Sequence, residues 1–532
     1  MTRPLRTAAA VRETAVQSSL PYLAAAFLVL LGWAAYTRTF SIPVFPMDDA
    51  YIVIHNAQTL LSGSDPNYAG SSPLTGTTSE VHLALVSGLM LFLHPRAALL
   101  TSLWLATLLY ALGLVRLARV NGAGRVAAAS IAALGLIAGQ APHQLMNGLE
   151  TGLMLAAVTW ALVLLSRPAG QPESKPSWLL PALCGLLPFV RPDLLPLSLL
   201  FLGLQAGRRW QQRRDLPDFC RRAGLDLAVA VLFALPWALW CWSSDGSLFP
   251  STINAKRFFF AQAGWPAGLK AKLVAAGLYH FLRDLGLLSV FSVFLVTTWL
   301  GRVGLVYGTI LLAAYYAQFP GALLTYEGRY LFPLLPFLLL GVLYALGQRR
   351  PVLRIGGGVV LALALAQSLI HLPDFWTRHK RNCYFAQHDL PGVAAWCNQH
   401  LPVGSTLLIH DAGYIAYGTH FHLVDMVGLK TPSSIPYHRA ITYPSGGKLR
   451  YQAVSEIALR GQTRYLVVQG RWDSSYATVS GLEASGWEVR LINGDYLYQI
   501  YSLRPPSDIS RALQPNPSFH PPVISGEGVT IE

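Results

Sequence analysis

Residues 45–80 read FPMDDAYIVIHNAQTLLSGSDPNYAGSSPLTGTTSE and come just after the first long apolar run of the chain, residues 20–39. Two adjacent carboxylates, Asp48 and Asp49, stand near the start of this stretch, and a long polar segment separates them from the next apolar run. An apolar run of about 20 residues is long enough to cross a bilayer as a helix. The sequence therefore predicts a pair of acids at a membrane boundary.

The composition is that of a membrane protein. Of the 532 residues, 53% are hydrophobic and only 12% are charged, whereas a soluble domain carries about 25% charged residues. The net charge of +14 does not indicate nucleic-acid binding, because most Lys and Arg residues lie in short loops between apolar runs, as in cytoplasmic loops of membrane proteins. A cleaved signal peptide is the alternative for the first run, but many runs follow it and no A-x-A site ends it.

We predict a polytopic α-helical membrane protein with eleven spans. Basic residues at the N-terminus and in the loops after residues 118, 207 and 347 then share one side, which the positive-inside rule makes cytoplasmic. A run of only 14 residues, 81–94, would break this alternation, so we expect it to lie on the outer surface as a juxtamembrane helix. The predicted spans are 20–39, 97–118, 125–141, 149–166, 178–190, 193–207, 223–243, 285–301, 303–322, 331–347 and 352–372.

The predicted topology gives two domains, a transmembrane domain (1–372, with an outer loop 40–96) and an outer domain (373–532). The outer domain is expected to be a soluble α/β domain, with strands near 405–417, 463–470 and 487–503 and a helix at 390–401. The Pro-rich end, residues 504–522, is expected to be extended. Cys383 and Cys397 lie in this domain, where a disulfide is possible in an oxidising compartment.

Polar and charged residues recur in the segments predicted to face outward at membrane level. A charge in the bilayer core costs about 2.5–3.5 kcal/mol on insertion scales, so ionisable groups near it usually have a function. We therefore take as site candidates, besides Asp48 and Asp49, the residues Tyr51, His55, Asn56, Asn147, Glu150, Arg191, Asp193, Asn254, Lys256, Arg257, Glu327 and Arg329.

This set of residues suits group transfer from a lipid-linked phosphate. Adjacent carboxylates repel each other, so one of them is expected to have a raised pKa, and a carboxylate beside a hydroxyl can act as a general base. Lys256, Arg329 and, third, Arg191 are the cations that could stabilise a phosphate leaving group. Asp48, Asp49 and Glu150 could also hold a divalent cation, although no motif requires one.

Several of these residues could instead have a purely structural role. The paired acids could simply begin a surface helix, because acidic side chains favour a helix N-terminus. Glu150 could likewise start a helix, and Asp411 could belong to a turn at the end of a strand. Arg191 could extend toward the membrane surface or pair with an acid, and Lys256 and Arg257 could anchor the chain at that surface.

A set of short motifs runs in order along most of the chain. The first outer segment contains DDAYIVIHNAQTLLSGSDPNY and LTGTTSEVHLALVS, and NGLETGLM, VRPDLLPL, FPSTINAK and EGRYLFPLLP follow. The outer domain contains HDAGYIAYGTHFHLVDMVGLKTP. In this order the motifs resemble the GT-C superfamily of integral-membrane glycosyltransferases, and most closely its branch with the mycobacterial terminal arabinofuranosyltransferase. Residues 79–81 depart from that branch, with Ser-Glu-Val where Ser-Pro-Leu is usual.

The resemblance implies a particular reaction. Members of the superfamily take sugars from polyprenyl phosphates at the outer face of the membrane and generally invert the anomeric centre. It implies that Asp48 is the catalytic base, that Asp49 supports it or binds the acceptor, and that Asp411 and Asp425 shape the acceptor site. The expected donor is a polyprenyl-phosphate sugar, with arabinofuranose a candidate, and the expected acceptor is an envelope glycan, glycolipid or glycoprotein. The expected location is a bacterial inner membrane, with the outer domain periplasmic.

Two further functions remain open from the sequence. One is a transporter or flippase of a lipid-linked sugar precursor, although the hydropathy shows no inverted repeat. The second is a non-enzymatic protein that binds an envelope glycan or takes part in assembly. An enzyme should place Asp48, Lys256 and Arg329 around one cavity, whereas a transporter should have its site near the bilayer midplane.

Overall fold

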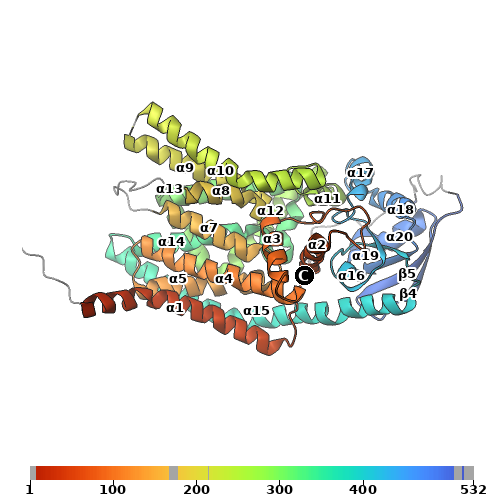
Figure 1. Cartoon of the computed structure of the whole chain (residues 1–532), viewed down its shortest axis with the longest axis horizontal. Coiled ribbons are helices and arrows are strands. Elements are labelled where there is room, and N and C mark those ends of the chain that lie inside the picture. Colours follow the sequence, from red (N-terminus) through yellow and green to blue (C-terminus); the bar gives the residue numbers. More distant parts are fainter. Residues whose placement is uncertain (1–7, 167–177, 214, 509–517, 520–532) are drawn as a thin grey trace, which may run out of the picture.

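The computed structural model describes residues 8–166, 178–213, 215–508 and 518–519. A bundle of helices forms one end of the molecule and a small sheet domain forms the other, and one long helix, α15, runs from the first into the second (Figure 1). The chain is a multi-pass membrane protein with a C-terminal α/β domain, as predicted.

Within the described residues, seven helical segments are long and apolar enough to cross a membrane, and shorter apolar helices lie among them. Every predicted span overlaps helical structure, but the predicted span 285–301 crosses the break at Thr298 between η3 and α13, and the predicted number of eleven spans stays a prediction. The seven segments are Ser19–Thr39 of α1 (Ala8–Thr39), Pro95–Val120 (α4), Leu216–Asp245 (α10), Ala267–Thr297 (α12 and η3), Trp299–Gln318 (α13), Tyr326–Leu346 (η5 and α14) and Pro351–His400 (α15). The remaining helices of this part are Arg125–Ile137 (α5), Ala141–Met146 (α6), Thr151–Leu165 (α7), Leu179–Val190 (α8), Leu195–Arg213 (α9) and Ser251–Phe260 (α11).

Helix α12 (Ala267–Leu285) occupies residues that we predicted to be part of an outer loop. Its buried residues recur every four positions, as expected for one face of an α-helix, and they are Leu273, Gly277, Phe281 and Leu285. A Cβ added at Gly277 would lie 2.6 Å from Cβ of Leu323, so the helix packs closely on the neighbouring segment. Polar residues on its opposite face hid this helix from a search for continuous apolar runs.

The short apolar run after the first outer segment forms helix α3 (Glu80–Met90), which packs between α2 (Asp49–Ser62) and α4. Ser79 caps it, because its hydroxyl accepts a hydrogen bond from the backbone N–H of His82. Eleven residues span about 16 Å as a helix. That length is too short for a hydrocarbon core of about 30 Å, which agrees with a juxtamembrane helix, and the placement of α3 on the outer surface stays a prediction.

Helix α15 (Pro351–His400) has 50 residues and is therefore about 75 Å long. It passes through the predicted domain boundary at residue 372 and includes the helix predicted at 390–401, so the two domains share one continuous element. Cys383 and Cys397 both lie on it as buried free thiols. Fourteen residues of helix separate them by about 21 Å, which excludes a disulfide, because its Cα atoms lie within about 7 Å.

The described part of the outer domain is built on a five-stranded sheet in the order β2-β1-β3-β5-β4. Strands β1 (Thr406–Ile409), β2 (His422–Asp425) and β3 (Tyr465–Gln469) are parallel, and β4 (Glu488–Asn493) and β5 (Tyr498–Arg504) complete the sheet as antiparallel strands. Strands β1 and β3 lie within the predicted regions 405–417 and 463–470, and the region 487–503 covers β4 and nearly all of β5. Residues 414–417, which were predicted as strand, instead belong to helix α16, and β2 was not predicted. The domain's helices are α16 (Tyr414–Gly418), α17 (Ile435–Tyr437), α18 (Arg450–Arg460), α19 (Gly470–Tyr476) and α20 (Thr478–Ala484).

The two faces of the sheet belong to different hydrophobic cores, because successive side chains of a strand point to opposite faces. Leu408 and Leu466 pack against helices of the outer domain. Leu407 belongs to a core that also contains Val393 of α15 and Ile54 of α2. The first outer segment and the outer domain therefore share a core, which fixes their relative position. Most of the Pro-rich segment 504–522 lies outside the described residues.

Candidate active site

A narrow pocket lies between the first outer segment, the ends of several bundle helices and the outer domain. Its free volume is about 30 Å³, room for little more than a water molecule, so a sugar can enter only if the lining side chains move apart. The polar and charged side chains around it include Asp49, Asn56, Glu150, Thr252, Lys256 and Arg329. Cations and carboxylates from four separate predicted segments thus meet in one place.

Arg329 reaches the pocket from a strained turn. Tyr326 and Glu327 have φ angles of 52° and 55°, and Gly328 has 70°. Non-glycine residues rarely adopt this left-handed conformation, and strain of this kind collects at functional sites. The turn is held by Gln144, whose side-chain amide donates to the carbonyl of Tyr326 at 2.7 Å, and this conformation directs the next residue, Arg329, inward.

A buried group of ionic side chains surrounds the Arg329 guanidinium. Its Nη2 lies 2.6 Å from Oε1 of Glu150, and its Nη1 lies 4.0 Å from Oδ2 of Asp49. Arg191 is 4.0 Å from the same Glu150 oxygen, but it donates two hydrogen bonds to Asp193 and lies behind the pocket rather than in its lining. Glu150 does precede a helix, α7, but its side chain also orients Arg329.

The paired acids point to different partners. Asp48 accepts hydrogen bonds from the backbone N–H groups of Gly413 and Tyr414, one on each carboxylate oxygen and both at 2.7 Å. It stands at the start of α2 but does not cap that helix with its side chain. Asp49, the first residue of α2, lines the pocket, and its side chain is 23% exposed. Of the two adjacent acids, Asp49 is therefore the one that lines the pocket together with Lys256 and Arg329.

Burial and then the nearby Asp411 carboxylate raise the pKa of Asp48 well above its ordinary value, against the effect of the two backbone donors. Burial also acts to raise the pKa of Asp411, but His410 and the hydroxyl of Tyr498, which hydrogen-bonds to Asp411, outweigh it and lower that pKa. The neighbour with the larger effect on Asp48 is therefore Asp411 of the outer domain rather than Asp49.

Helix α11 brings one of its three predicted site residues to the pocket. Lys256 lines it and, within the described part of the chain, makes no hydrogen bond or ion pair. Arg257 turns toward the outer domain, where it lies over the ring of Tyr443 at 5.4 Å from the centroid. Asn254 is exposed and outside the pocket lining. Among these three, Lys256 alone is placed to meet an anion in the pocket.

The remaining candidates support the site from outside its lining. Tyr51 is buried in an edge contact with the ring of Tyr414. Asn147 is buried, and its side-chain amide donates to Gln144, the residue that holds the strained turn. Glu327 pairs with Arg378 at 3.1 Å and lines a separate cleft of about 340 Å³ beside α15. These residues shape or brace the surroundings rather than face the pocket.

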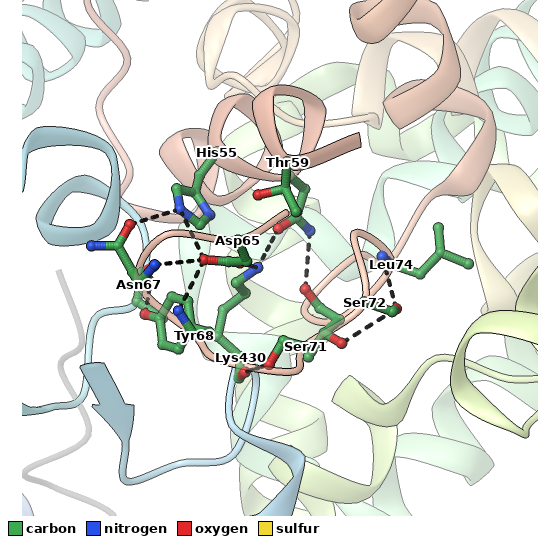
Figure 2. A network of polar contacts seen from close by, with 12 residues as sticks. His55, Thr59, Asp65, Asn67, Tyr68, Ser71, Ser72, Leu74 and Lys430 are labelled. Carbon is green, nitrogen blue, oxygen red and sulfur yellow. Dashed lines mark hydrogen bonds and ion pairs between the residues drawn. The ribbon is translucent and has the colours of Figure 1, made fainter. Parts of the chain in front are cut away.

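Two further candidates, His55 and Asp425, belong to a buried network around Lys430, and Figure 2 shows the part of it that contains His55. Asp425 accepts the backbone N–H of Lys430, and burial raises the pKa of Asp425 to about 6. His55 contacts Asn67 at 3.1 Å, and burial together with Lys430 lowers its pKa to about 4, so it is neutral at pH 7.

The three carboxylates considered as metal ligands have different neighbours. Asp48 accepts two backbone hydrogen bonds, Glu150 pairs with Arg329, and Asp49 faces the pocket. In the described part of the chain, no three His, Cys, Asp or Glu side chains are grouped so that they could hold a metal ion. A divalent cation at these carboxylates stays an option that the sequence leaves open and does not require.

Sequence reasoning missed several residues of the site. Lys430 and Asp65 are an ion pair between segments 365 residues apart, and no local pattern marks such a pair. Thr77 and Leu429 also line the pocket. The motif series held a signal for all four residues, because DDAYIVIHNAQTLLSGSDPNY contains Asp65, LTGTTSE contains Thr77, and the motif that ends in MVGLKTP contains Leu429 and Lys430.

Comparison with known protein families and solved structures identifies the class of fold to which this architecture belongs. A protein-family profile described as a domain of unknown function (DUF8728) matches residues 380–501. No curated protein matches the chain. Among solved structures, ArnT from Cupriavidus metallidurans in the apo state is similar, with 13% identity, a TM-score of 0.50 and coverage of 94% of this chain and 99% of ArnT. The chain thus has the fold of the GT-C membrane glycosyltransferases.

Two further structures give the range of similarity. ArnT bound to undecaprenyl phosphate has 13% identity and a TM-score of 0.50, with 92% of this chain and 98% of ArnT covered. The arabinofuranosyltransferase AftD from Mycobacteria has 16% identity and a TM-score of 0.49, with 94% of this chain covered but only 40% of AftD. At such identities, the likeness to ArnT concerns the fold alone.

Proposed function

We propose that the protein is a glycosyltransferase that moves a sugar from a polyprenyl-phosphate donor to an envelope glycan, glycolipid or glycoprotein at the outer face of the membrane. The observation that carries this proposal is the placement of Asp49, Lys256 and Arg329 in the lining of one pocket. A carboxylate can accept a proton from an attacking hydroxyl, and two cations can stabilise a phosphate that leaves with negative charge.

In the proposed reaction, a hydroxyl oxygen of the acceptor forms a bond to the anomeric carbon of the donor sugar. The bond between that carbon and the phosphate oxygen breaks, and its electron pair stays on polyprenyl phosphate. The hydroxyl proton passes to Asp49. A single displacement of this kind inverts the anomeric centre and passes through an oxocarbenium-like state.

Asp49 replaces Asp48 as the proposed base for a geometric reason. A general base must lie within hydrogen-bond reach of the proton that it removes, and Asp49 is the member of the pair in the pocket lining. Both carboxylate oxygens of Asp48 are engaged by the backbone N–H groups of Gly413 and Tyr414. We assign to Asp48 the role of fixing the outer domain to the first outer segment.

The position of the pocket favours an enzyme over a transporter. Glu150 directly precedes α7, and Arg329 lies near the start of the segment Tyr326–Leu346. The pocket is therefore at the end of the bundle that faces the sheet domain, whereas transporter sites lie near the bilayer midplane. ArnT has been solved with undecaprenyl phosphate, which supports a lipid-linked phosphate as the donor carrier.

Purified full-length protein should transfer sugar from one member of a panel of polyprenyl-phosphate sugars, scored by radiolabel in the acceptor fraction or by release of polyprenyl phosphate. Arabinofuranose is the first sugar to test, because the first outer segment resembles the arabinosyl branch. An Asp49→Asn protein is the inactive control. Absence of both transfer and donor hydrolysis across the panel, with a folded protein that binds no polyprenyl phosphate, would refute the proposal.

A further inference from the structure

The side chain of Lys430, from the outer domain, is fully buried within the first outer segment (Figure 2). Its Nζ donates to Oδ2 of Asp65 at 3.1 Å and to Oδ1 of Asn56 at 2.6 Å. The side chain of Asp65 is only 1% exposed. A complete charge pair is thus removed from water at the contact between the two parts of the chain.

Both ends of this ion pair are held by backbone hydrogen bonds. On the outer-domain side, Asp425 accepts the N–H groups of Val427 and Lys430, both at 2.8 Å. On the side of the first outer segment, Oδ1 of Asp65 accepts the N–H groups of Asn67 and Tyr68, both at 2.9 Å. The two charges therefore meet in one defined geometry.

The contact continues from Asn56 into the pocket wall. The side-chain amide of Asn56 donates to Oγ1 of Thr77 at 2.8 Å and to the carbonyl of Thr75 at 3.0 Å. Gly76, between them, has a φ of +87°, and a Cβ there would lie 2.8 Å from Cδ of Lys430. Gly76 and Thr77 line the pocket, so Lys430 packs directly against the back of its wall.

We propose that Lys430 is a positioning residue for the transferase pocket, acting with Asp65 and Asn56 as a clamp that sets the place of segment 75–79. The inference rests on the proposed function. A buried ion pair often contributes no more stability than a well-packed apolar pair, and in some proteins such pairs serve to specify one geometry. Leu429, the neighbour of Lys430, also lines the pocket, so the outer domain both supplies and orients part of the site.

The test uses full-length protein with both charges removed, Lys430→Met/Asp65→Asn, because either single change would leave a buried unpaired charge. Asn56→Ala is the second variant, since it keeps the ion pair and cuts its link to the wall. The control is Arg504→Met/Glu488→Gln, an exposed ion pair of the same domain. The readouts are melting temperature, hydrogen–deuterium exchange of residues 74–79, binding of undecaprenyl phosphate and kcat.

The double variant should keep a melting temperature near that of the wild type, whereas Asn56→Ala should melt at a lower temperature, because it removes three hydrogen bonds of a buried side chain. Both clamp variants should stay folded and should exchange faster at residues 74–79. Turnover should fall about 10²-fold, the cost of a misplacement near 1 Å, while undecaprenyl phosphate binds within about threefold of wild type, because Lys256 and Arg329 are intact. The control variant should match the wild type in every readout.

Wild-type turnover in both clamp variants would overturn the proposal, as would lost turnover with unchanged exchange. If the double variant fails to fold, the exchange of residues 74–79 in Asn56→Ala decides the outcome, because Asn56 itself lines the pocket and its loss can lower turnover directly. If the wild-type protein transfers no sugar, the proposed function fails separately. The exchange data then decide the clamp alone, since faster exchange confined to residues 74–79 supports it and unchanged exchange refutes it.

Discussion

Replacement of Asp49 by Asn is the most direct test of the proposed chemistry. The change keeps the size of the side chain and removes its basicity. Loss of a general base typically reduces turnover 10²–10⁴-fold, which corresponds to about 3–5 kcal/mol on the activation barrier. Binding of polyprenyl phosphate should be kept or become tighter, because a negative charge leaves the pocket while Lys256 and Arg329 stay.

The structure also predicts that Asp49→Asn protein folds normally. The nearest cation, Arg329, is 4.0 Å from Asp49 but only 2.6 Å from Glu150, which remains as its partner. Partly exposed pairs are worth about 0–1 kcal/mol, so the melting temperature should change little. Single-turnover kinetics with the active donor, together with a thermal melt, measure both quantities.

Asp48→Asn is the matched comparison within the same pair of acids. An Asn side chain can accept only one of the two backbone hydrogen bonds from Gly413 and Tyr414. The second N–H then faces a donor, which costs about 1–3 kcal/mol of folding stability. We expect a lower melting temperature and a loss of turnover smaller than that of Asp49→Asn. Full stability with lost turnover in Asp48→Asn, and normal turnover in Asp49→Asn, would refute the reasoning and restore Asp48 as the base.

Three further predictions concern the anion site, the domain contact and the topology. Lys256→Ala should weaken binding of undecaprenyl phosphate about 10-fold or more, as expected for a charge-assisted contact, without a change in melting temperature, and unchanged binding would remove Lys256 from the site. Gly413→Ala should impair folding and transfer, because its Cβ would lie 2.1 Å from the carbonyl oxygen of Asp48. Gly470→Ala is the control, since a Cβ there meets open space. Equal stability and turnover of the two variants would contradict the close contact between Gly413 and Asp48. In intact cells an impermeant thiol reagent should label Val403→Cys in the outer domain but not the exposed native Cys220, and labelling of Cys220 would reverse the predicted orientation.

The sequence determined the features that depend on local composition. Apolar runs such as 97–118 predict helices because burial in a bilayer requires about 20 apolar residues in a row. Strands β1 and β3 were recognisable from short β-branched and aliphatic runs between turn residues. Helix α12 was missed because only one of its faces is buried. Strand β2 was missed because its four residues, HLVD, include only two aliphatic side chains, whereas the equally short β1 reads TLLI.

The candidate site was predictable as a set of residues but not as an arrangement. The motif series placed Asp49, Glu150, Lys256 and Arg329 among the candidates, and the pocket brings these four together. The candidates also included Asn254, from the same motif as Lys256, and Arg257, the residue after it, and both lie on the helix of Lys256 but point elsewhere. Adjacent helical residues differ in direction by about 100°, so a motif on one helix does not reveal which of its side chains faces a pocket.

Tertiary structure alone decided the roles of the two acids and of Lys430. Asp48 and Asp49 are equivalent in the sequence, and the difference between them arises from the backbone of Gly413 and Tyr414, more than 360 residues away. Lys430 is one basic residue among 40 Lys and Arg, and only its burial against Asp65 and Asn56 distinguishes it. Contacts of this kind depend on how distant segments pack, and packing is a property of the whole chain rather than of any local pattern within it.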